Sequence, residues 1–407
     1  MKVLQVNAVY NYSSTGRTTA EIHHTLKECG IDSFVACSRI NNTDGYVYHI
    51  GSEADIKIHG LMSRISGMQG YFSYFATKKL LRYMDSLNPD IVHLRILHAN
   101  YINLPLLLKY LADKKIAVVI TLHDCWFFTG KCCHYIDDNC YKWKEGCGNC
   151  PRLKNDNVSW FFDRTKKLWR DKRDLFFRID RLGVIGVSDW TTNQAKQSFL
   201  SSAKIVKRIY NWIDSDVFKP KDTNHLRSAM KLQNNFVILG VASGWSEKKG
   251  LSQFIKMADH IGSQDRIILI GNMKQKVGLP NNIIHIEQTD DIEQLAEYYS
   301  MADVFVQLSL TETFGKVTAE ALSCGTPAIV YNATANPELI GEGCGYIAEK
   351  NDLSQVIEHI MQVKKNRKSF YSEKCIKYAK ANFDKTKNIK EHIDMYNELY
   401  KLDRKIC

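Results

Sequence analysis

The sequence lacks long apolar runs, internal repeats and low-complexity segments. No window of its 407 residues supplies the roughly 18 uncharged apolar residues that a membrane-spanning helix needs. The N-terminal run MKVLQVNAVY is short and soon meets Asn, Ser and Gly, which is not the pattern of a secretory signal peptide. We therefore expect a cytoplasmic protein, and 44% hydrophobic with 24% charged residues is the composition of an ordinary globular chain.

The sequence also lacks the G-x-G-x-x-G fingerprint of dinucleotide-binding domains. The expected first strand, residues 3–7, is followed by a loop over residues 11–17 that holds a single glycine, Gly16. Such a glycine can let backbone N–H groups approach a phosphate, or it can serve only the geometry of the turn. The missing fingerprint argues against a dinucleotide-dependent redox enzyme.

Two doubly wound, Rossmann-like α/β domains are predicted from the alternation of apolar strands with helical patterns. The expected strands are residues 3–7, 34–37, 90–94, 117–122 and 184–188 in the first half, and 236–241, 266–271, 282–286, 304–308 and 326–330 in the second. We expect domains at residues 1–210 and 211–385 and a Cys-rich insertion at about 125–151. A C-terminal helix over residues 386–407 is expected to pack back on one of the domains, such as the N-terminal one.

The formal charge of +11 raises the question of a nucleic acid or an anionic membrane surface as partner. Residues 160–182 alternate Lys and Arg with aromatics at roughly helical spacing, and residues 65–83 are aromatic and end in basic side chains. Each segment suits a helix at a lipid surface, and each also suits an ordinary helix that packs on the core. Peripheral contact with the inner membrane is thus one of two hypotheses for these segments.

Ligands of such domains lie beyond the carboxyl ends of the strands, so the loops after strands hold the candidate residues. His123 and Asp124 follow the strand at 117–122, where an imidazole oriented by Asp124 can hydrogen-bond a sugar hydroxyl. Lys248 and Lys249 stand directly before a helix, where an ammonium and a helix N-terminus together suit a phosphate. A structural histidine and a solvated lysine pair are the respective alternatives.

The most specific stretch is SLTETFGKVTAEALSCGTPAIV, residues 309–330. Glu312 is expected on the loop after a strand, Phe314 and Gly315 in the turn, and a helix from about Lys316 presents its first-turn amides to an anion. These amides can hold phosphate, Glu320 can accept the hydroxyls of a ribose, and Glu312 can accept hydroxyls of a sugar. The stretch therefore favours a binding site for a nucleoside diphosphate sugar. The alternative, in which Glu320 is a plain exposed helix residue with no ligand, is less favoured.

This stretch resembles a known family signature. Glu312-x7-Glu320, continued by EALSCGTPAIV and the later Pro337-Glu338, is similar to the signature of the retaining GT-B glycosyltransferases of family four, the glycosyl transferases group 1. VSDWTTNQAKQSFL and YNWIDSDVFKP resemble the inter-domain passage of that family. SSTGRTTAEI, TLHDCWFFTGKC and CGNCP resemble a bacterial branch that assembles surface polysaccharides. The resemblance covers most of the chain and implies the GT-B fold.

The resemblance also implies roles for single residues. Glu312 would contact the donor sugar near the reaction centre, Glu320 would bind the ribose, and Lys249 would neutralise the leaving diphosphate. His123 would contact the transferred sugar, and Gly16 would let its loop close on donor and phosphate. The predicted catalytic residues are therefore Glu312, His123 and Lys249.

The chain departs from the family pattern at one place. Where the family usually has an arginine shortly before the lysine, this chain has Ser243 and Gly244, so Lys249 and backbone amides would carry more of the phosphate, unless Arg17 or Lys316 substitutes. The predicted donor-binding residues are Gly16, Arg17, Ser243, Phe314, Gly315, Lys316, Val317 and Glu320.

The implied reaction retains the configuration of the anomeric carbon. An oxocarbenium-like transition state would expel a nucleoside diphosphate, whose electrostatic stabilisation would be the main contribution of the protein. The leaving phosphate would help to deprotonate the acceptor hydroxyl, and no covalent nucleophile is assigned. Asp214-Ser215-Asp216 matches a D-x-D metal pattern but is expected to be a turn, so we predict no catalytic metal or other catalytic cofactor.

The implied acceptor is a growing, lipid-linked surface polysaccharide or oligosaccharide. A nucleotide-sugar epimerase or hydrolase of the same fold is the nearest alternative, because a fold alone does not fix the reaction. A zinc-containing nucleic-acid-binding protein is a remote one, and dispersed charge together with the acids Glu312 and Glu320 argues against nucleic acid as a partner. The residues name neither the donor sugar, the base, the linkage nor the oligomeric state.

Residues 132–151, CCHYIDDNCYKWKEGCGNCP, hold five of the 12 cysteines. Cys132, Cys140, Cys147 and Cys150 offer four thiols, and the final Cys-x2-Cys has the spacing that lets two thiolates share one zinc ion. A closed four-thiolate site is structural, and it would brace the loop that positions His123. Reduced buried thiols and a disulfide stay open, with Cys133 and His134 as spare ligands.

Overall fold

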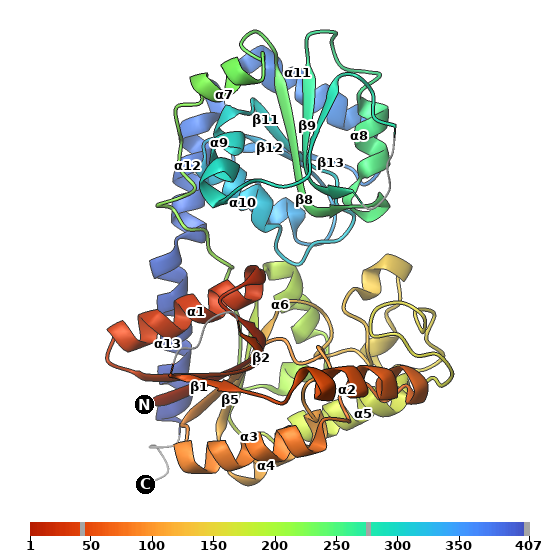
Figure 1. The fold of residues 1–407 in the computed structure, drawn as a ribbon, viewed down its shortest axis with the longest axis vertical. Coiled ribbons are helices and arrows are strands. Elements are labelled where there is room, and N and C mark those ends of the chain that lie inside the picture. Colours follow the sequence, from red (N-terminus) through yellow and green to blue (C-terminus); the bar gives the residue numbers. More distant parts are fainter. Residues whose placement is uncertain (41–44, 274–277, 403–407) are drawn as a thin grey trace. The chain divides into compact units, whose positions relative to one another are not determined.

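The computed structural model describes residues 1–40, 45–273 and 278–402, and the chain divides into two compact units. Unit 1 consists of Met1–Ile209 together with Ile389–Cys407, and unit 2 is Tyr210–Asn388. Each unit contains one parallel sheet with helices packed against it (Figure 1). The doubly wound α/β fold class expected from the sequence is confirmed for both units.

The sheet of unit 1 has seven strands in the order β3-β2-β1-β4-β5-β6-β7. The strands are β1 (Lys2–Tyr10), β2 (Asp32–Ile40), β3 (Val47–His49), β4 (Ile91–Leu94), β5 (Ala117–Leu122), β6 (Leu182–Gly186) and β7 (Ile205–Arg208). All neighbours pair in parallel. Every residue of β4 and β5 is buried, which is why these strands appear in the sequence as continuous apolar runs. The strand order turns back between β1 and β4, and such a switch point is where ligands of doubly wound sheets bind.

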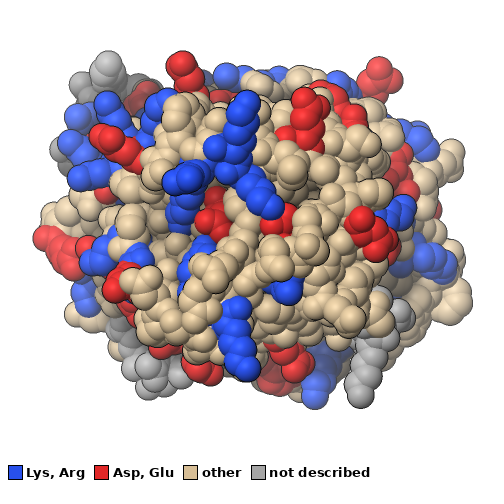
Figure 2. All heavy atoms as spheres, turned by 90° about the horizontal axis from the view of Figure 1, so that it is seen from above, with Lys and Arg blue, Asp and Glu red and all other residues tan. Residues whose placement is uncertain are grey.

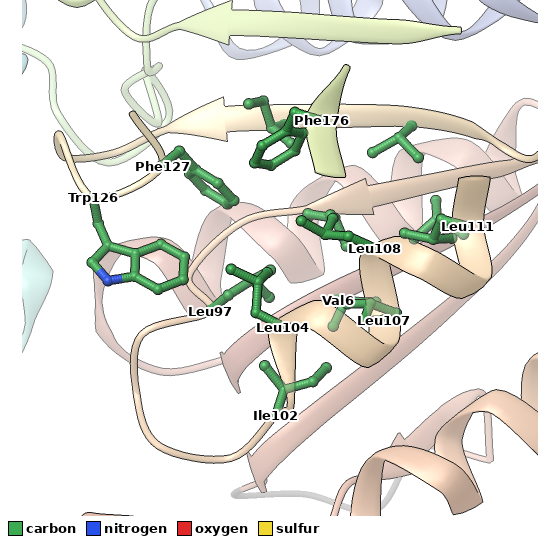
Figure 3. Close-up of a cluster of buried hydrophobic side chains, with 14 of the residues drawn as sticks. Val6, Leu97, Ile102, Leu104, Leu107, Leu108, Leu111, Trp126, Phe127 and Phe176 are labelled. Carbon is green, nitrogen blue, oxygen red and sulfur yellow. The ribbon is translucent and has the colours of Figure 1, made fainter. Parts of the chain in front are cut away.

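The helices of unit 1 are α1 (Ser13–Glu28), α2 (Glu53–Ser66), α3 (Tyr74–Leu87), α4 (Leu104–Asp113), α5 (Thr165–Phe176), α6 (Asp189–Lys196) and most of α13 (Lys385–Lys401). Alternation along β1 separates two layers. Leu4 and Val6 belong to the main hydrophobic core, whereas Gln5 and Asn7 bond to Thr19 of α1 on the other face. Figure 3 shows the main core, where leucines of α4 gather with Trp126, Phe127 and Phe176.

The sheet of unit 2 has six parallel strands in the order β10-β9-β8-β11-β12-β13. The strands are β8 (Val237–Trp245), β9 (Arg266–Met273), β10 (Ile283–Ile286), β11 (Val304–Gln307), β12 (Ala328–Tyr331) and β13 (Gly345–Ala348). The helices are α7 (Asn224–Ala229), α8 (Leu251–Met257), α9 (Ile292–Met301), α10 (Lys316–Ser323), α11 (Leu353–Asn366) and α12 (Ser369–Phe383). Here the switch point lies between β8 and β11, so the loops after these two strands are the expected ligand-binding loops.

Two expected helices differ from the structure. Residues 65–83 do not form one continuous helix, because α2 ends at Ser66 and is capped by Gly67 with a left-handed φ of +72°, and α3 begins only at Tyr74. A side chain at position 67 could not be placed, since a Cβ there would lie 2.3 Å from the backbone oxygen of Phe162. Residues 160–164 precede α5 and are not helical. The helical spacing of their aromatic and basic residues was therefore misleading.

Charged side chains of both signs are interspersed on the face drawn in Figure 2, where Lys and Arg alternate with Asp, Glu and uncharged residues. Within the described part of the chain, no helix combines the length and the apolar character needed to cross a membrane.

Candidate active site

The loop after β11 in unit 2 holds Glu312 in a fixed position. Its backbone N–H donates to the Thr334 hydroxyl at 2.8 Å, and its carbonyl accepts from the N–H of Ala335 at 3.3 Å. Both partners belong to the segment that follows β12. The loop is therefore fastened to its neighbour, and the carboxylate of Glu312 starts from a defined backbone.

The Glu312 carboxylate makes an ion pair with Lys249, whose Nζ lies 2.5 Å from Oε1. The same Oε1 accepts from Nε2 of Gln307, the last residue of β11, at 3.0 Å. The amide oxygen of Gln307 in turn accepts from the hydroxyl of Thr318 in the first turn of α10. The structure thus brings together two predicted catalytic residues, Lys249 and Glu312, and adds Gln307 and Thr318 to them.

Gly250 explains how Lys249 reaches Glu312. Its φ is +79°, and a Cβ at this position would lie 2.5 Å from Cβ and 2.8 Å from the carbonyl oxygen of Leu308. Leu310 also donates its N–H to the carbonyl of Lys248 at 3.0 Å. Only glycine permits this close approach of the segment after β8 to the segment after β11.

Glu320 is buried on α10, one turn after Lys316. Its Oε2 accepts from the Tyr299 hydroxyl of α9 at 2.9 Å, and Lys316 Nζ lies 4.0 Å from Oε1. Burial and the neighbouring Glu320 carboxylate raise the pKa of Tyr299 well above its usual range, so the phenol keeps its proton and acts as the donor. Glu320 is therefore not the plain exposed helix residue of the alternative interpretation.

The turn before α10 matches the expectation from the sequence. Gly315 caps the helix with a φ of +87°, and a Cβ there would lie 2.8 Å from Leu339 Cδ1. Phe314 is buried against Tyr210 and Phe383. Lys316 and Val317, both half-buried, form the first turn of α10.

Ser243 does not lie on a loop. Strand β8 continues to Trp245, with a bulge between Val241 and Gly244, and Ser243 is an exposed residue within this bulge. The buried Trp245 side chain, which donates Nε1–H to the carbonyl of Ile270 at 3.2 Å, holds this end of the strand on β9. The predicted loop over residues 242–250 therefore shrinks to residues 246–250, a short 3-10 turn before α8.

In unit 1 the expected phosphate-binding loop over residues 11–17 is mostly helix. Helix α1 begins at Ser13, so Gly16 is buried in its first turns and Arg17 is an exposed helical residue. A Cβ on Gly16 would lie 3.1 Å from Val9 Cγ2 and 3.3 Å from the backbone nitrogen of Asn11. Gly16 thus allows α1 to start close to the end of β1. The sequence pattern could not distinguish this structural role from a role in a phosphate-binding loop.

His123 lies at the carboxyl end of β5 beside a buried arginine that the sequence analysis missed. Arg95 follows β4 directly, is 1% exposed, and its Nη2 lies 3.0 Å from His123 Nε2 and 2.7 Å from the Thr18 hydroxyl. A guanidinium only donates, so Nε2 of His123 accepts and the imidazole proton is on Nδ1. Burial, reinforced by Arg95, lowers the pKa of His123 well below its usual range, so the ring is neutral.

The guanidinium of Arg95 retains hydrogen-bonding capacity. Its Nε and Nη1 are buried and have no hydrogen-bond partner in the described part of the chain. Burial lowers the pKa of Arg95 to about 10, which still leaves the group charged at neutral pH. A polar residue directly after the apolar strand DIVHL was the signal that could have identified Arg95.

Asp124 does not orient His123 as predicted. Its Oδ2 pairs with His98 Nε2 at 2.8 Å, and its Oδ1 accepts from the N–H of Trp126 at 2.8 Å. Burial alone would raise the pKa of Asp124, but the imidazole of His98 and this N–H lower it to about 2. The orienting partner of His123 is Arg95, and Asp124 instead joins His98 and Cys133 in a group whose ligand atoms lie within 4.8 Å of one another.

The four predicted zinc ligands lie in one place. Cys132, Cys140, Cys147 and Cys150 all line the same small cavity, and each is a free cysteine. Cys133 and His134, the spare ligands, do not line it. Asp214-Ser215-Asp216 forms the expected turn, in which Asp214 Oδ1 accepts from the N–H of Asp216 at 3.1 Å.

Comparison with known proteins agrees with this fold. Sucrose-phosphate synthase from Thermosynechococcus elongatus superposes with a TM-score of 0.71 at 14% identity over 99% of this chain and all of the other. Anabaena HepE in complex with UDP superposes with a TM-score of 0.70 at 16% identity over 98% of this chain and all of the other. Two Rossmann-like units that match such structures along their whole length define the class, a protein of the GT-B fold.

Family models cover both units. A model described as Glycosyltransferase Family 4 matches residues 15–217, and one described as Glycosyl transferases group 1 matches residues 222–382. The chain belongs to this family of glycosyltransferases. A curated relative, the putative colanic acid biosynthesis glycosyl transferase WcaC of Escherichia coli K12, is 24% identical over 276 residues, which are 66% of this chain and 66% of that protein. The match thus spans just under two thirds of the relative.

Proposed function

We propose that the protein is a retaining glycosyltransferase that moves a sugar from a nucleoside diphosphate sugar to a lipid-linked saccharide of a bacterial surface polysaccharide. The observation that carries this proposal is the Lys249–Glu312 ion pair, held by Gln307 at the N-terminus of α10. The name of the colanic acid relative supports the polysaccharide, and the UDP bound to HepE supports a nucleotide donor.

The donor would bind with its diphosphate at Lys249 and the first-turn amides of α10, which begins at Lys316. An ammonium and a helix N-terminus both favour an anion, and here they lie on neighbouring loops of one sheet. Glu320, buried and oriented by Tyr299, would accept the ribose hydroxyls. Binding of the diphosphate would compete with Glu312 for Lys249, so the ion pair would open when the donor arrives.

In the transfer step, the acceptor oxygen would form a bond to the anomeric carbon while the bond from that carbon to the diphosphate oxygen breaks. The acceptor proton would pass to the leaving diphosphate on the same face, which gives retention without a covalent intermediate. Lys249 and the α10 amides would stabilise the negative charge that develops on the leaving group. Glu312, released from Lys249, would hold hydroxyls of the donor sugar.

The test measures the transfer of sugar from a set of nucleotide sugars to a lipid-linked acceptor. The wild type is compared with the Lys249→Met and Glu312→Gln variants. We expect both variants to lose roughly 10²- to 10³-fold in kcat, the effect of removing one preorganised group that stabilises charge in a transition state. Lys256→Met, an exposed lysine on the following helix α8, is the matched control and should transfer like the wild type. Epimer or free sugar as the main product in the presence of acceptor would instead establish the alternative function.

A membrane surface is proposed as the place where unit 1 meets its acceptor. Exposed apolar side chains come from three neighbouring segments, α2, the start of α3, and the segment before α5. This aromatic patch consists of Ile58, Leu61, Met62, Ile65, Tyr74, Phe75, Trp160, Phe161 and Phe162. The segments are linked by a hydrogen bond from Trp160 N–H to the Arg64 carbonyl at 2.6 Å and by a contact of His59 Nδ1 with the Ser73 hydroxyl at 2.7 Å.

The composition of the aromatic patch favours an anionic lipid leaflet as its occupant. Phe75 is 78% exposed and Phe161 69% exposed, which is costly in water and suited to the boundary of lipid headgroups. Exposed cations flank them on the same segments, namely Lys57, Arg64, Lys78, Lys79, Arg164 and Lys166. Apolar insertion together with basic side chains is the usual pattern of peripheral binding to negatively charged membranes.

Flotation with liposomes tests the aromatic patch. The wild type should float with vesicles that contain phosphatidylglycerol and much less with neutral phosphatidylcholine vesicles, while Phe75→Ser with Phe161→Ser and the Lys78→Glu, Lys79→Glu pair should each reduce flotation. Phe370→Ser, which removes a 56% exposed aromatic from unit 2, is the matched control. Equal flotation of all variants would contradict the membrane assignment and leave the transfer reaction untouched.

A further inference from the structure

The segment between β5 and α5 spans residues 123–164 and contains little regular structure. Only two short 3-10 turns, Tyr135–Asp138 and Lys142–Lys144, occur in it. Loops of this length without helices or strands are uncommon in compact domains and need another source of order. Yet Trp143 and Tyr135 of this segment are almost completely buried. Something other than secondary structure must therefore hold the segment in place.

Four thiols from this segment surround a single small cavity. Cys132, Cys140, Cys147 and Cys150 line it, and its volume is about 20 Å³. A cavity of roughly 10–15 Å³ on this measure has room for one water molecule, so the space fits a single ion rather than an organic ligand. The fifth cysteine of the cluster, Cys133, points elsewhere, since its sulfur contacts His98 and Asn157.

The backbone turns sharply next to three of the four cysteines. Asn139 directly before Cys140 and Asn149 directly before Cys150 both have a φ of +47°, and Gly146 before Cys147 has a φ of +149°. These conformations are rare outside Asn and Gly, and they reverse the chain so that successive thiols face one point. Local turn residues thus place the cysteines around the cavity.

The thiols already have the surroundings of metal ligands. The backbone N–H of Gly130 donates to Cys147 Sγ at 3.2 Å. Hydrogen bonds to the ligand atoms are the usual outer shell of a metal centre. Position 130 requires glycine, because a Cβ there would lie 3.0 Å from Cys147 Cβ and 2.7 Å from the Thr165 carbonyl.

Positive charge is fixed beside the cavity. Lys131 and Lys142 both line it. Lys131 is 2% exposed, and its Nζ donates to the carbonyls of Leu153, Asn155 and Asn157 at 2.8–3.2 Å. Four thiolates around one divalent cation form a formally dianionic centre, and burial of such a centre requires compensating cations. The two lysines provide them.

We propose that these four cysteines bind one zinc ion in a closed, tetrahedral and purely structural site. Among the described residues, no three of the four sulfur atoms lie within 4.8 Å of one another. Zinc–sulfur distances of about 2.3 Å would bring them to about 3.8 Å apart, so binding would draw the turns inward. The consequence is a braced segment that holds Trp126 and the loop of His123, independently of the reaction carried out in unit 2.

The proposal is tested by metal analysis of the full-length protein, purified without a metal-affinity step and under reducing conditions. We expect about one zinc per chain, released by a thiol-reactive mercurial, and at least about a tenfold lower content in Cys147→Ser and Cys150→Ser. Cys133→Ser is the matched control from the same segment and should keep its zinc. Less than about a tenth of an equivalent in the wild type, or a disulfide found by mass spectrometry after alkylation, would overturn the proposal.

A second measurement, made on the wild type, tests the proposal even if the cysteine variants fail to fold. Chelation of zinc from the wild type should lower its thermal unfolding temperature, and added zinc but not magnesium should restore it, because a ligand that binds only the folded state stabilises it. An unchanged unfolding temperature after complete removal of zinc would contradict a structural role. Loss of zinc in His98→Ala with retention in Cys147→Ser would place the ion at His98, Asp124 and Cys133 and overturn the assignment.

Discussion

At the level of single residues, Glu312 owes its position to Gln307 as much as to Lys249. The Gln307 side chain is 4% exposed, accepts a hydrogen bond from Thr318 and donates one to Glu312. It thereby links the end of β11 to the first turn of α10. Gln307 is a positioning residue, because its contacts are with the residues that would meet the donor.

Gln307→Met should therefore damage catalysis more than folding. The change leaves the Thr318 hydroxyl without its hydrogen-bond partner, and the Glu312 carboxylate keeps only its ion pair with Lys249. The loss of these hydrogen bonds should cost roughly 1–3 kcal/mol of stabilisation at the site. We expect kcat to fall by about tenfold or more with a KM for the donor that changes less, measured by initial rates. Gln307→Glu should lower kcat further at neutral pH, since a second carboxylate repels Glu312. In acid, where a carboxylate takes up a proton, kcat should partly recover. A pH profile identical to that of the wild type would argue against the positioning role.

His59 makes unit 1 sensitive to acid. Burial, which penalises the charged imidazolium, lowers its pKa to about 4. Nε2 accepts from the N–H of Gly70 at 3.3 Å, and Nδ1 bonds the Ser73 hydroxyl at 2.7 Å. The folded pKa is below the unfolded value of about 6.5, so the unfolded chain binds the proton more strongly. The stability from neutral His59 is complete above about pH 6.5 and is lost as the pH falls toward 4.

Because the unfolded chain protonates more readily at His59, the free energy of unfolding should fall by about 2 kcal/mol between pH 7 and pH 5. Urea unfolding at the two pH values measures this, and His59→Gln, whose amide can make both hydrogen bonds without titrating, is the comparison. The wild type should lose about 2 kcal/mol more than the variant between the two values. Equal losses would show that His59 keeps its proton affinity on folding.

At the level of elements, α13 completes unit 1 by packing on β6. A Cβ on Gly183, the second residue of β6, would lie 2.5 Å from Met395 Cε and 2.9 Å from Leu399 Cδ1. On β4, which is separated from β6 by β5, His93 bonds the Tyr396 hydroxyl at 2.7 Å. A helix that comes last in the chain thus covers strands from its first half.

Gly183→Val should overpack this contact and destabilise the protein by about 1–3 kcal/mol. Thermal or urea unfolding measures the loss, and Met395→Ala in the same chain should recover part of it, because the two side chains compete for the same space. Gly45→Val, at an exposed position where a Cβ meets nothing within 4 Å, is the control and should change the stability by no more than about 0.5 kcal/mol. Strict additivity of Gly183→Val and Met395→Ala would contradict the packing.

The sequence predicted the central elements well and the contacts poorly. Strands such as β5 are recognised because both faces are buried, whereas β3 and β7 at the sheet edges are short and half-exposed and give no apolar run. The motif placed Glu312 and Glu320 correctly on a loop and a helix. It could not reveal that Asp124 turns to His98 or that Arg95 meets His123, because such pairings depend on strand order and not on spacing along the chain.

At the level of the whole molecule, the two units differ in how the chain builds them. Unit 2 is continuous from Tyr210 to Asn388, whereas unit 1 needs Met1–Ile209 and the residues from Ile389 onward. Deletion of everything after Asn388 should therefore remove the calorimetric unfolding transition of unit 1 and leave that of unit 2. Two unchanged transitions would show that α13 is dispensable.

This discontinuity sets the order in which the protein can mature on the ribosome. Although unit 1 is synthesised first, its sheet stays uncovered at Gly183 and His93 until α13 has left the exit tunnel. Unit 2, translated later, already has all of its residues at that moment. The half of the protein that begins earliest is thus finished last, and its nascent form exposes apolar surface for the time needed to translate about 200 further residues, a natural point for chaperone binding.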